Sequence, residues 1–284
     1  MFRTILISIV IIIFHHSVLA QSPWARSKSG FYAQLGYNFI PTYGTLFGKD
    51  GEDIILDHEV SEQQIQLYGE YGLSNKTTLI LSLPYVINER GASNPDSPLM
   101  FAVEDTGSIS GLGNTRFAVR HQFLNGHVAL AGTMLVGLPA PADYQPFTEL
   151  STGYDALLIQ PMISIGKGFG RYYAYGYGSY GFRSNDYSHF LNLGVEGGAQ
   201  LGHFWVIAFS EWLYSLENGS RGLPGLDVLT GLNANDQGWF SFGLKAIWQI
   251  NRFTGITVSG AGAFGGQYVP KSPGIGISAY FKWD

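Results

Sequence analysis

The sequence lacks cysteine altogether, which excludes a disulfide framework and any zinc site built on thiolates. Charged residues are also scarce, at 13% of the 284 residues, and they leave a net charge of −5. This acidic balance argues against nucleic acid as a partner, and an apolar content of 45% argues against a disordered chain. Glycine and aromatic residues are abundant instead, with 38 glycines and 15% aromatics. Such a composition is typical of a β-protein that does not face water on all sides.

Long apolar runs are missing too, apart from one close to the start. Residues 5–14 are almost wholly apolar, follow a basic residue, and precede a small residue that lies just before Gln21. The run is too short to cross about 30 Å of hydrocarbon as a helix. The pattern therefore predicts a signal peptide, residues 1–20, rather than a membrane anchor. The exported chain then comprises residues 21–284. No later run reaches the length of a transmembrane helix, so this chain either builds a large soluble core or crosses a membrane as strands.

Apolar and polar residues alternate with a period of two, as in strands with two different faces. The alternation is clear in residues 64–73, 79–88, 116–123, 191–201, 240–250 and 275–283. Weaker candidates are residues 29–41, 127–139, 154–167, 171–184, 203–217 and 253–265. The predicted total is about 12 strands, and all but residues 116–123 reach the roughly 9–11 residues that a tilted membrane strand needs. Aromatic residues near strand ends are expected to lie at the membrane interfaces; these are Tyr71, Trp205, Trp212, Trp239 and Trp248.

The connections between these segments alternate between short and long. Short ones fall at residues 74–76, 125–126, 168–170, 202–203 and 251–252. Longer ones are expected at residues 42–58, 90–110, 140–153, 218–235 and 266–273, with one further short link near 184–188. A soluble sandwich has no reason to sort its loops in this way. The sequence therefore predicts an all-β fold, a single closed antiparallel transmembrane β-barrel with short periplasmic turns and long extracellular loops. It would lie in the outer membrane of a Gram-negative bacterium, in contact with its lipid.

Charged residues on the inward face are the candidate site, because a lysine or arginine facing lipid near the midplane costs about 2–4 kcal/mol. The predicted lumen-lining residues are Glu70, Arg116, Arg120, Glu196, Glu211, Lys245 and Lys282. Two interpretations stay open. The side chains either line a wet passage or pair with one another and close the lumen. Barrels of about eight strands are filled, whereas those of about 16–18 strands are open, and 12 lies between.

Two local features carry separate expectations. The acidic stretch at residues 49–62 offers oxygen ligands for Ca²⁺, but it lacks the residue order of a calcium loop, which favours a solvated acidic loop. Neither a metal nor a cofactor is predicted. Pro84 and Pro161 lie inside predicted strands, where proline removes a ladder hydrogen bond. A bulge or an earlier strand end is expected at each.

Three motifs resemble a known family. Residues 83–86 (Leu-Pro-Tyr-Val) close a strand, residues 110–114 (Ser-Gly-Leu-Gly-Asn) open the next, and residues 138–139 (Leu-Pro) close another. This arrangement resembles the transporter-like outer-membrane barrels associated with the phenol meta-cleavage pathway, over about residues 60–215. Asn114 stands where the family usually has aspartate. The resemblance implies the movement of small compounds, apolar or aromatic ones among them, across the outer membrane, and it carries over no catalytic residue.

The leading prediction is a passive outer-membrane channel for small solutes, which is not an enzyme. A structural or assembly barrel with a lumen filled by salt bridges is one alternative. An outer-membrane lipid-modifying enzyme is another, for which His121 and Ser210 are the candidates, although they lie on strands that are not neighbours. The barrel assembly machinery is an expected partner through the C-terminal strand, whose aromatic end at Trp283 is followed by Asp284.

Overall fold

The computed structural model describes residues 21–97, 106–141, 148–221 and 230–283. The predicted signal peptide, residues 1–20, and the last residue, Asp284, lie outside these ranges. Among the described residues, no helix is long and apolar enough to cross a bilayer. The strands are β1 (Phe31–Phe47), β2 (Asp53–Gly72), β3 (Thr77–Ser93), β4 (Gly107–Leu112), β5 (Arg116–Asn125), β6 (Ala129–Gly137), β7 (Leu158–Phe169), β8 (Tyr172–Arg183), β9 (Phe190–Leu201), β10 (Phe204–Ser215), β11 (Gly238–Gln249), β12 (Thr254–Gln267), β13 (Val269–Pro270) and β14 (Gly274–Trp283).

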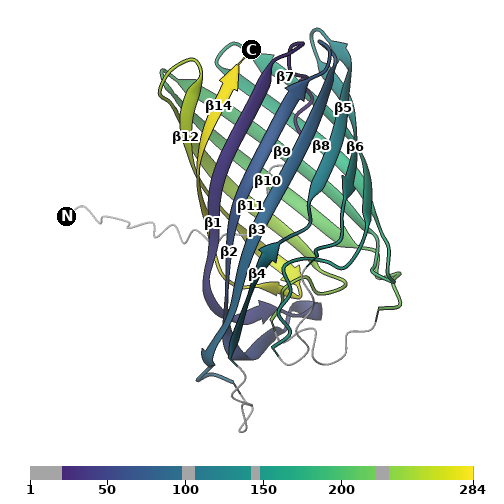
Figure 1. Ribbon diagram of the computed structural model, residues 1–284, viewed down its shortest axis with the longest axis vertical. Helices are drawn as coiled ribbons and strands as arrows, with labels where there is room; N and C mark the ends of the chain where they lie inside the picture. The colour runs from purple at the N-terminus through teal and green to yellow at the C-terminus, as the bar shows by residue number, and fades with distance from the viewer. Residues whose placement is uncertain (1–20, 98–105, 142–147, 222–229, 284) are drawn as a thin grey trace, which may run out of the picture.

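The strands form one closed antiparallel barrel (Figure 1). Neighbouring strands of the barrel pair all the way around the sheet, and β1 pairs with both β2 and β14, which closes it. Two barrel strands are broken into pieces: β4 and β5 both pair with β3, and β13 and β14 both pair with β1. The barrel therefore has 12 strands, as predicted. Closure satisfies the backbone groups of every strand through its neighbours, which hydrocarbon could not do.

The short and long connections lie at opposite ends. The five short turns, at residues 73–76, 126–128, 170–171, 202–203 and 250–253, lie at the end where β1 begins and β14 ends. This end, at the top of Figure 1, is called the turn end. The opposite end, called the loop end, carries the longer connections at residues 94–106, 138–157 and 216–237.

The prediction of a long loop at residues 42–58 is wrong. A hairpin replaces it, in which β1 and β2 are 17 and 20 residues long and are joined by residues 48–52. Residues 53–62 of the expected acidic loop thus belong to β2. Asp57 is buried there and forms an ion pair with Arg90 of β3, 2.7 Å away. Strand pairing continues past the membrane because inward side chains such as Leu56 find a packed core at the loop end.

The two faces of the barrel have opposite chemistry. Large apolar side chains such as Leu35 and Val195 are 59% and 60% exposed on the outside. Polar side chains such as Thr78, Ser82 and Ser164 are buried on the inside. Since this order is the reverse of a water-soluble core, the outer face suits hydrocarbon. Exposed aromatics stand near both rims; they include Tyr71, Phe169, Tyr172, Trp248 and Trp283 toward the turn end and Phe182, Trp212, Tyr214 and Phe240 toward the loop end.

The two prolines have different consequences. Pro84 pairs with Gln66 on one side, and on the other it faces the break between β4 and β5. One extra residue lies in that break, between the pairs Ser82–Arg116 and Tyr85–Leu112, so the expected bulge falls on the partner strand. At Pro161 the β7–β8 ladder skips two pairs without any register shift, so the bulge expected there is absent from these described strands.

Candidate functional site

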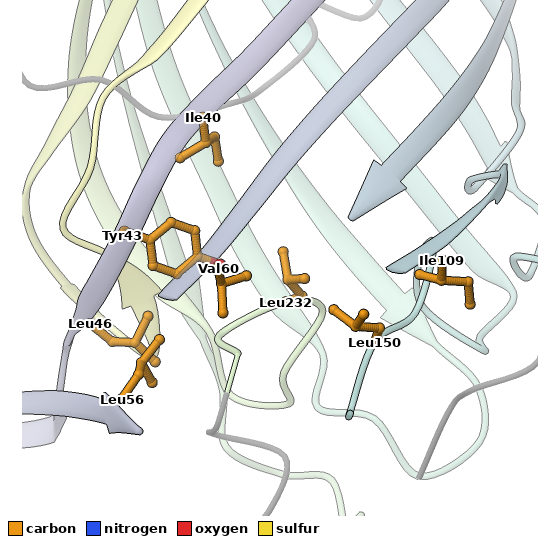
Figure 2. Close-up of a cluster of buried hydrophobic side chains, with 8 residues drawn as sticks. All are labelled: Ile40, Tyr43, Leu46, Leu56, Val60, Ile109, Leu150 and Leu232. Carbon is orange, nitrogen blue, oxygen red and sulfur yellow. The ribbon is translucent and has the colours of Figure 1, made fainter. Parts of the chain in front are cut away.

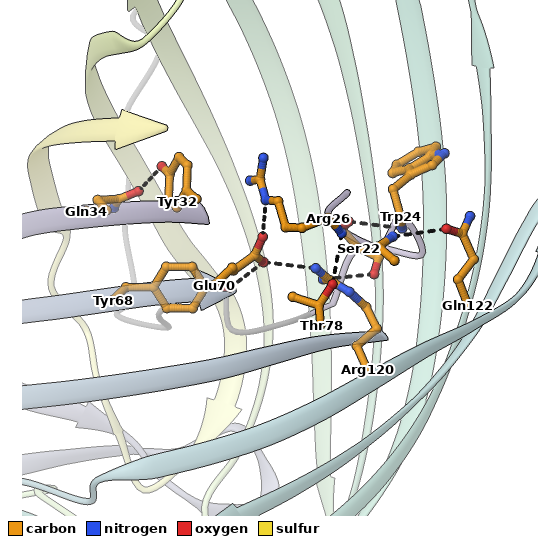
Figure 3. A network of polar contacts seen from close by, with 11 residues as sticks. Ser22, Trp24, Arg26, Tyr32, Gln34, Tyr68, Glu70, Thr78, Arg120 and Gln122 are labelled. Atoms are coloured by element: carbon orange, nitrogen blue, oxygen red, sulfur yellow. Dashed lines mark hydrogen bonds and ion pairs between the residues drawn. The ribbon is translucent and has the colours of Figure 1, made fainter. Parts of the chain in front are cut away.

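The barrel is closed at the turn end by the residues that precede β1. Residues 21–29, here called the N-terminal segment, precede β1, and residues 21, 22 and 24–27 line the space inside the barrel (Figure 3). Their backbone bonds to inward side chains, from Ala25 N to Gln122 Oε1 at 3.1 Å and from Arg26 N to Thr78 Oγ1 at 2.8 Å. The Trp24 ring meets the rings of two tyrosines of β8 edge-on. The part of the segment inside the barrel is therefore held by side chains from several strands, whereas Ser29 N donates to the backbone carbonyl of Gly72 at 2.7 Å.

Glu70 joins the N-terminal segment to the barrel wall. Its carboxylate accepts from Arg26 Nε at 2.6 Å and from Arg120 Nη2 at 3.1 Å, and Tyr68 donates its hydroxyl at 2.7 Å (Figure 3). Arg120 also donates to the carbonyl of Ser22 at 3.2 Å. Two of the seven predicted charged residues, Glu70 and Arg120, thus meet in one network with a cation that sequence reasoning missed.

Glu196 and Lys245 form a second inward ion pair, 2.5 Å apart. The hydroxyl of Tyr173 donates to the same carboxylate at 2.8 Å, and the lysine ammonium lies 4.5 Å from the ring centre of Phe209. Tyr173 also lies over Gly198 of the neighbouring strand, where any side chain would collide with the ring. The glycines of β9 thus make room for inward aromatic rings.

The other three predicted residues lie apart from these pairs. Glu211 is buried, and it accepts from Tyr177 Oη at 2.8 Å. Arg116 faces the space beneath the loop end. Lys282 has the inward position near the end of β14. The seven residues are therefore spread over the length of the barrel, and only four of them form ion pairs with one another.

A cavity of about 650 Å³ lies between the N-terminal segment and the wall, and we call it the lumen cavity. Its aromatic lining consists of Trp24, Tyr32, Tyr68, Tyr173, Tyr175 and Phe209. The opposite side is formed by small or hydroxyl-bearing residues of β12 and β14, among them Thr257, Ser259, Ala261, Gly276 and Ser278. The three cations and two carboxylates on its walls all take part in ion pairs, so the cavity offers flat rings and hydroxyl groups beside charges that are already paired.

The loop end is closed by a buried apolar cluster, shown in Figure 2 and called the loop-end cluster. It consists of Ile40, Tyr43, Leu46, Leu56, Val60, Ile109, Leu150 and Leu232. Leu150 and Leu232 come from the two longest connections, whose last residues fold inward over the barrel. Polar contacts fix them, with Tyr43 Oη donating to the carbonyl of Thr230 at 2.7 Å and Asn88 Nδ2 to that of Ser151 at 2.7 Å.

A smaller cavity of about 160 Å³ lies beneath this cover. The two cavities thus lie between two covers, the N-terminal segment at one end and the loop-end cluster at the other. No local sequence pattern predicts either cover. A tryptophan and an arginine, Trp24 and Arg26, in an otherwise non-periodic stretch were the only signal for the first.

The residues considered for lipid-modifying chemistry do not meet. His121 on β5 contacts Thr77 Oγ1 through Nδ1 at 3.0 Å. Ser210 on β10 donates to the carbonyl of Ser241 at 2.8 Å. Four strands, β6 to β9, separate β5 from β10 in the sheet. Nothing in this geometry activates the serine hydroxyl.

No protein-family model matches this chain, and no curated protein does. Solved structures do match. A COG4313 outer membrane channel from Pseudomonas putida F1 aligns with a TM-score of 0.70 at 14% identity, over 94% of this chain and 100% of that one. This chain has the fold of an outer-membrane barrel. The β domain of the Bordetella autotransporter BrkA gives 0.51 at 12% identity, over 90% of this chain and 100% of that one. The NanC porin gives 0.50 at 7% identity, over 89% and 100%.

Proposed function

We propose that this protein is a passive outer-membrane channel of a Gram-negative bacterium, and that small uncharged aromatic solutes pass through it. The lumen cavity carries the proposal, because it combines stacked ring surfaces with charges that are already paired. The Pseudomonas putida protein with the same fold, which is described as an outer membrane channel, supports the same conclusion. The C-terminal strand β14, which ends at Trp283, is the element through which the barrel assembly machinery would recognise the chain.

The chemistry of the lumen cavity favours one class of solute. A planar ring can stack on Tyr32, Tyr175 or Phe209, and such contacts contribute about 0.5–1.5 kcal/mol beyond area burial. A phenolic hydroxyl can bond to Ser259 or Ser278. A charged solute would leave water without gaining a free counter-charge, which is costly. The motif resemblance to barrels of the phenol meta-cleavage pathway points to the same class.

In this proposal solute passage depends on movement of both covers, because folded chain lies across part of each end of the barrel. The N-terminal segment is held by hydrogen bonds and ion pairs, whereas the loop-end cluster is held by apolar packing. The two covers therefore respond to different perturbations. A loss of charge pairing loosens the first, and a loss of buried side-chain volume loosens the second.

One observation favours a second candidate, a structural barrel that passes nothing. Arg120 and Glu196 are held in ion pairs that narrow the lumen, as expected of a filled barrel. A channel lets solute cross the membrane, whereas a filled structural barrel does not, so solute flux distinguishes the two candidates. No observation favours the lipid-modifying enzyme, since His121 and Ser210 lie apart.

The test uses refolded protein, residues 21–284, in liposomes and planar bilayers, with a matched variant that lacks residues 21–29. A band that migrates differently before and after boiling shows that each sample is folded. We expect phenol to enter faster than benzoate, which has a similar shape but carries a charge, and the shortened variant to raise the flux of both. If neither protein passes any solute, the filled structural barrel is correct.

A further inference from the structure

The outer wall of the barrel carries a shallow trench over β7 to β10. Its volume is about 630 Å³, and its lining is almost entirely apolar. Ala174, Gly197 and Ala208 form the floor, and they are direct cross-strand neighbours on β8, β9 and β10. A methyl group is the largest side chain on this floor, whereas the surrounding belt carries large exposed residues. The trench is flanked by Ile165, Phe169, Val195 and Phe242.

A cation stands at one end of this trench. Lys167 of β7 pairs across the ladder with Ala174, so it continues the row of floor residues. It is exposed, and it lies three residues before the turn at 170–171, which places it near the membrane boundary. Among the described strands it is the only lysine or arginine on an outward position. No described carboxylate lies within ion-pair distance of its ammonium, which lies 5.6 Å from the ring centre of Phe169.

The trench leads from this cation into the hydrocarbon. Lys167 and Ala174 lie two residues from the ends of their strands at the turn end. Gly197 and Ala208 lie four residues from the corresponding ends of theirs. The floor therefore rises away from the turn end as it crosses from β8 to β10. A charged group at the membrane boundary and an apolar trench that extends into the membrane match the headgroup and the acyl chain of a phospholipid.

We propose that this trench binds a phospholipid of the leaflet at the turn end, with one acyl chain along Ala174, Gly197 and Ala208 and the phosphate on Lys167. The site rests on the membrane placement proposed above, and it does not depend on solute passage. An acyl chain that enters the trench leaves the hydrocarbon of the bilayer and not water, so it gains little hydrophobic free energy. Selectivity over bulk lipid must then come from close packing on the small residues and from the phosphate–lysine contact.

The experiment measures how many phosphatidylglycerol molecules stay on the folded barrel during native mass spectrometry from lipid nanodiscs. Lys167→Gln removes the cation. Ala174→Leu combined with Ala208→Leu fills the trench with side chains that already suit a lipid-facing position. Lys76→Gln, at another short turn, and Ala246→Leu, an outward position on β11 outside the trench, are the matched controls. We expect retention to fall about fivefold for Lys167→Gln, the factor that one lysine contact near the membrane surface supplies, and to fall for the filled trench as well, with no fall in the controls.

Equal retention in Lys167→Gln and in the wild type would overturn the proposal, and so would an equal fall in the controls. Wild-type dimers that vanish in the filled variant, with lipid retention unchanged, would assign the trench to a second copy of the chain instead. Insertion into nanodiscs and the shift of the unboiled band are recorded on the same samples. A barrel that inserts normally but shows no difference in lipid retention therefore refutes this site while leaving the proposed channel intact.

Discussion

Glu70 on β2 and Arg120 on β5 form an ion pair of 3.1 Å across the intervening strand β3, and the guanidinium is only 1% exposed. The same carboxylate holds Arg26 of the N-terminal segment at 2.6 Å. One acidic side chain thus forms ion pairs with a cation of the wall and a cation of the cover. Because an unpaired buried charge is costly, the pair and the seated segment depend on each other.

Replacing Glu70 is expected to release the N-terminal segment. Glu70→Ala leaves Arg120 without its carboxylate, and breaking a buried pair in this way costs about 3–5 kcal/mol. Because the chain has no cysteine, a Ser22→Cys substitution gives a single labelling site inside the barrel. We expect the thiol to react much faster in the Glu70→Ala background than with Glu70 intact. Glu196→Gln breaks the other ion pair without touching the segment, and it should leave the labelling rate unchanged. An equal rise in both variants would show that only general loosening was measured.

The loop-end cover is expected to depend on buried volume. Leu150 is fully buried in the loop-end cluster, so Leu150→Ala should destabilise the inward-folded connection by about 2–5 kcal/mol. The measurement is thermal unfolding, together with the labelling rate of a Ser151→Cys thiol from the loop side. Leu35→Ala, at an outward position 59% exposed, removes the same atoms without creating a cavity and is the control. A larger effect from the outward leucine would contradict the role of the cluster.

Acid is expected to weaken one link between connections at the loop end. Hydrogen bonds from Lys49 Nζ at 2.7 Å and Gln267 Nε2 at 3.1 Å lower the pKa of Glu217 below its ordinary value. A lowered carboxyl pKa stabilises the fold above the ordinary carboxyl range, and the contribution disappears as the pH falls through the lowered value. The pair is exposed, so its contribution is at most about 1 kcal/mol. The difference in melting temperature between wild type and Glu217→Gln should therefore be small near neutral pH and vanish once the pH has fallen well below the ordinary carboxyl range. A difference that grows in acid would reverse the assigned sign.

Glycines on opposite faces of β9 are expected to differ in their tolerance of a methyl group. At Gly194 a Cβ would collide with the ring of Tyr177, whose hydroxyl is held by Glu211. Gly194→Ala should therefore destabilise the barrel by about 1–3 kcal/mol, as overpacking does. At the outward Gly197 the nearest atom to an added Cβ lies 3.6 Å away, so Gly197→Ala should be neutral or stabilising. Urea unfolding of both variants in lipid vesicles makes the comparison, and equal losses would contradict it.

Local alternation was sufficient to predict the barrel and its 12 strands. It failed at residues 42–58, where β1 and β2 continue as a hairpin beyond the membrane and inward residues such as Leu46 pack under folded connections. Where the two faces of a strand do not differ in polarity, apolar and polar residues do not alternate, so the sequence pattern gives no sign of such burial. Trp205 and Trp239, expected at the interfaces, occupy inward positions, because position along a strand does not fix the face by itself.

The covers could not be predicted from local pattern at all. The N-terminal segment is fixed by backbone N–H groups of Ala25 and Arg26 that bond to side chains 97 and 52 residues away. Such contacts leave no period in the sequence. Partners for Glu70 and Glu196 were equally hidden, since alternation assigns a side chain to a face but does not say which residue on a distant strand lies opposite.

Two independent covers on one compartment separate leakage from transit. If each cover opens a small fraction of the time, a continuous hole exists only for the product of the two fractions, which is far smaller than either. A molecule that rests in the 650 Å³ space needs one exit at a time, and the cell keeps its permeability barrier while it does so. Residence between openings, rather than bore width, would then set the selectivity of this protein.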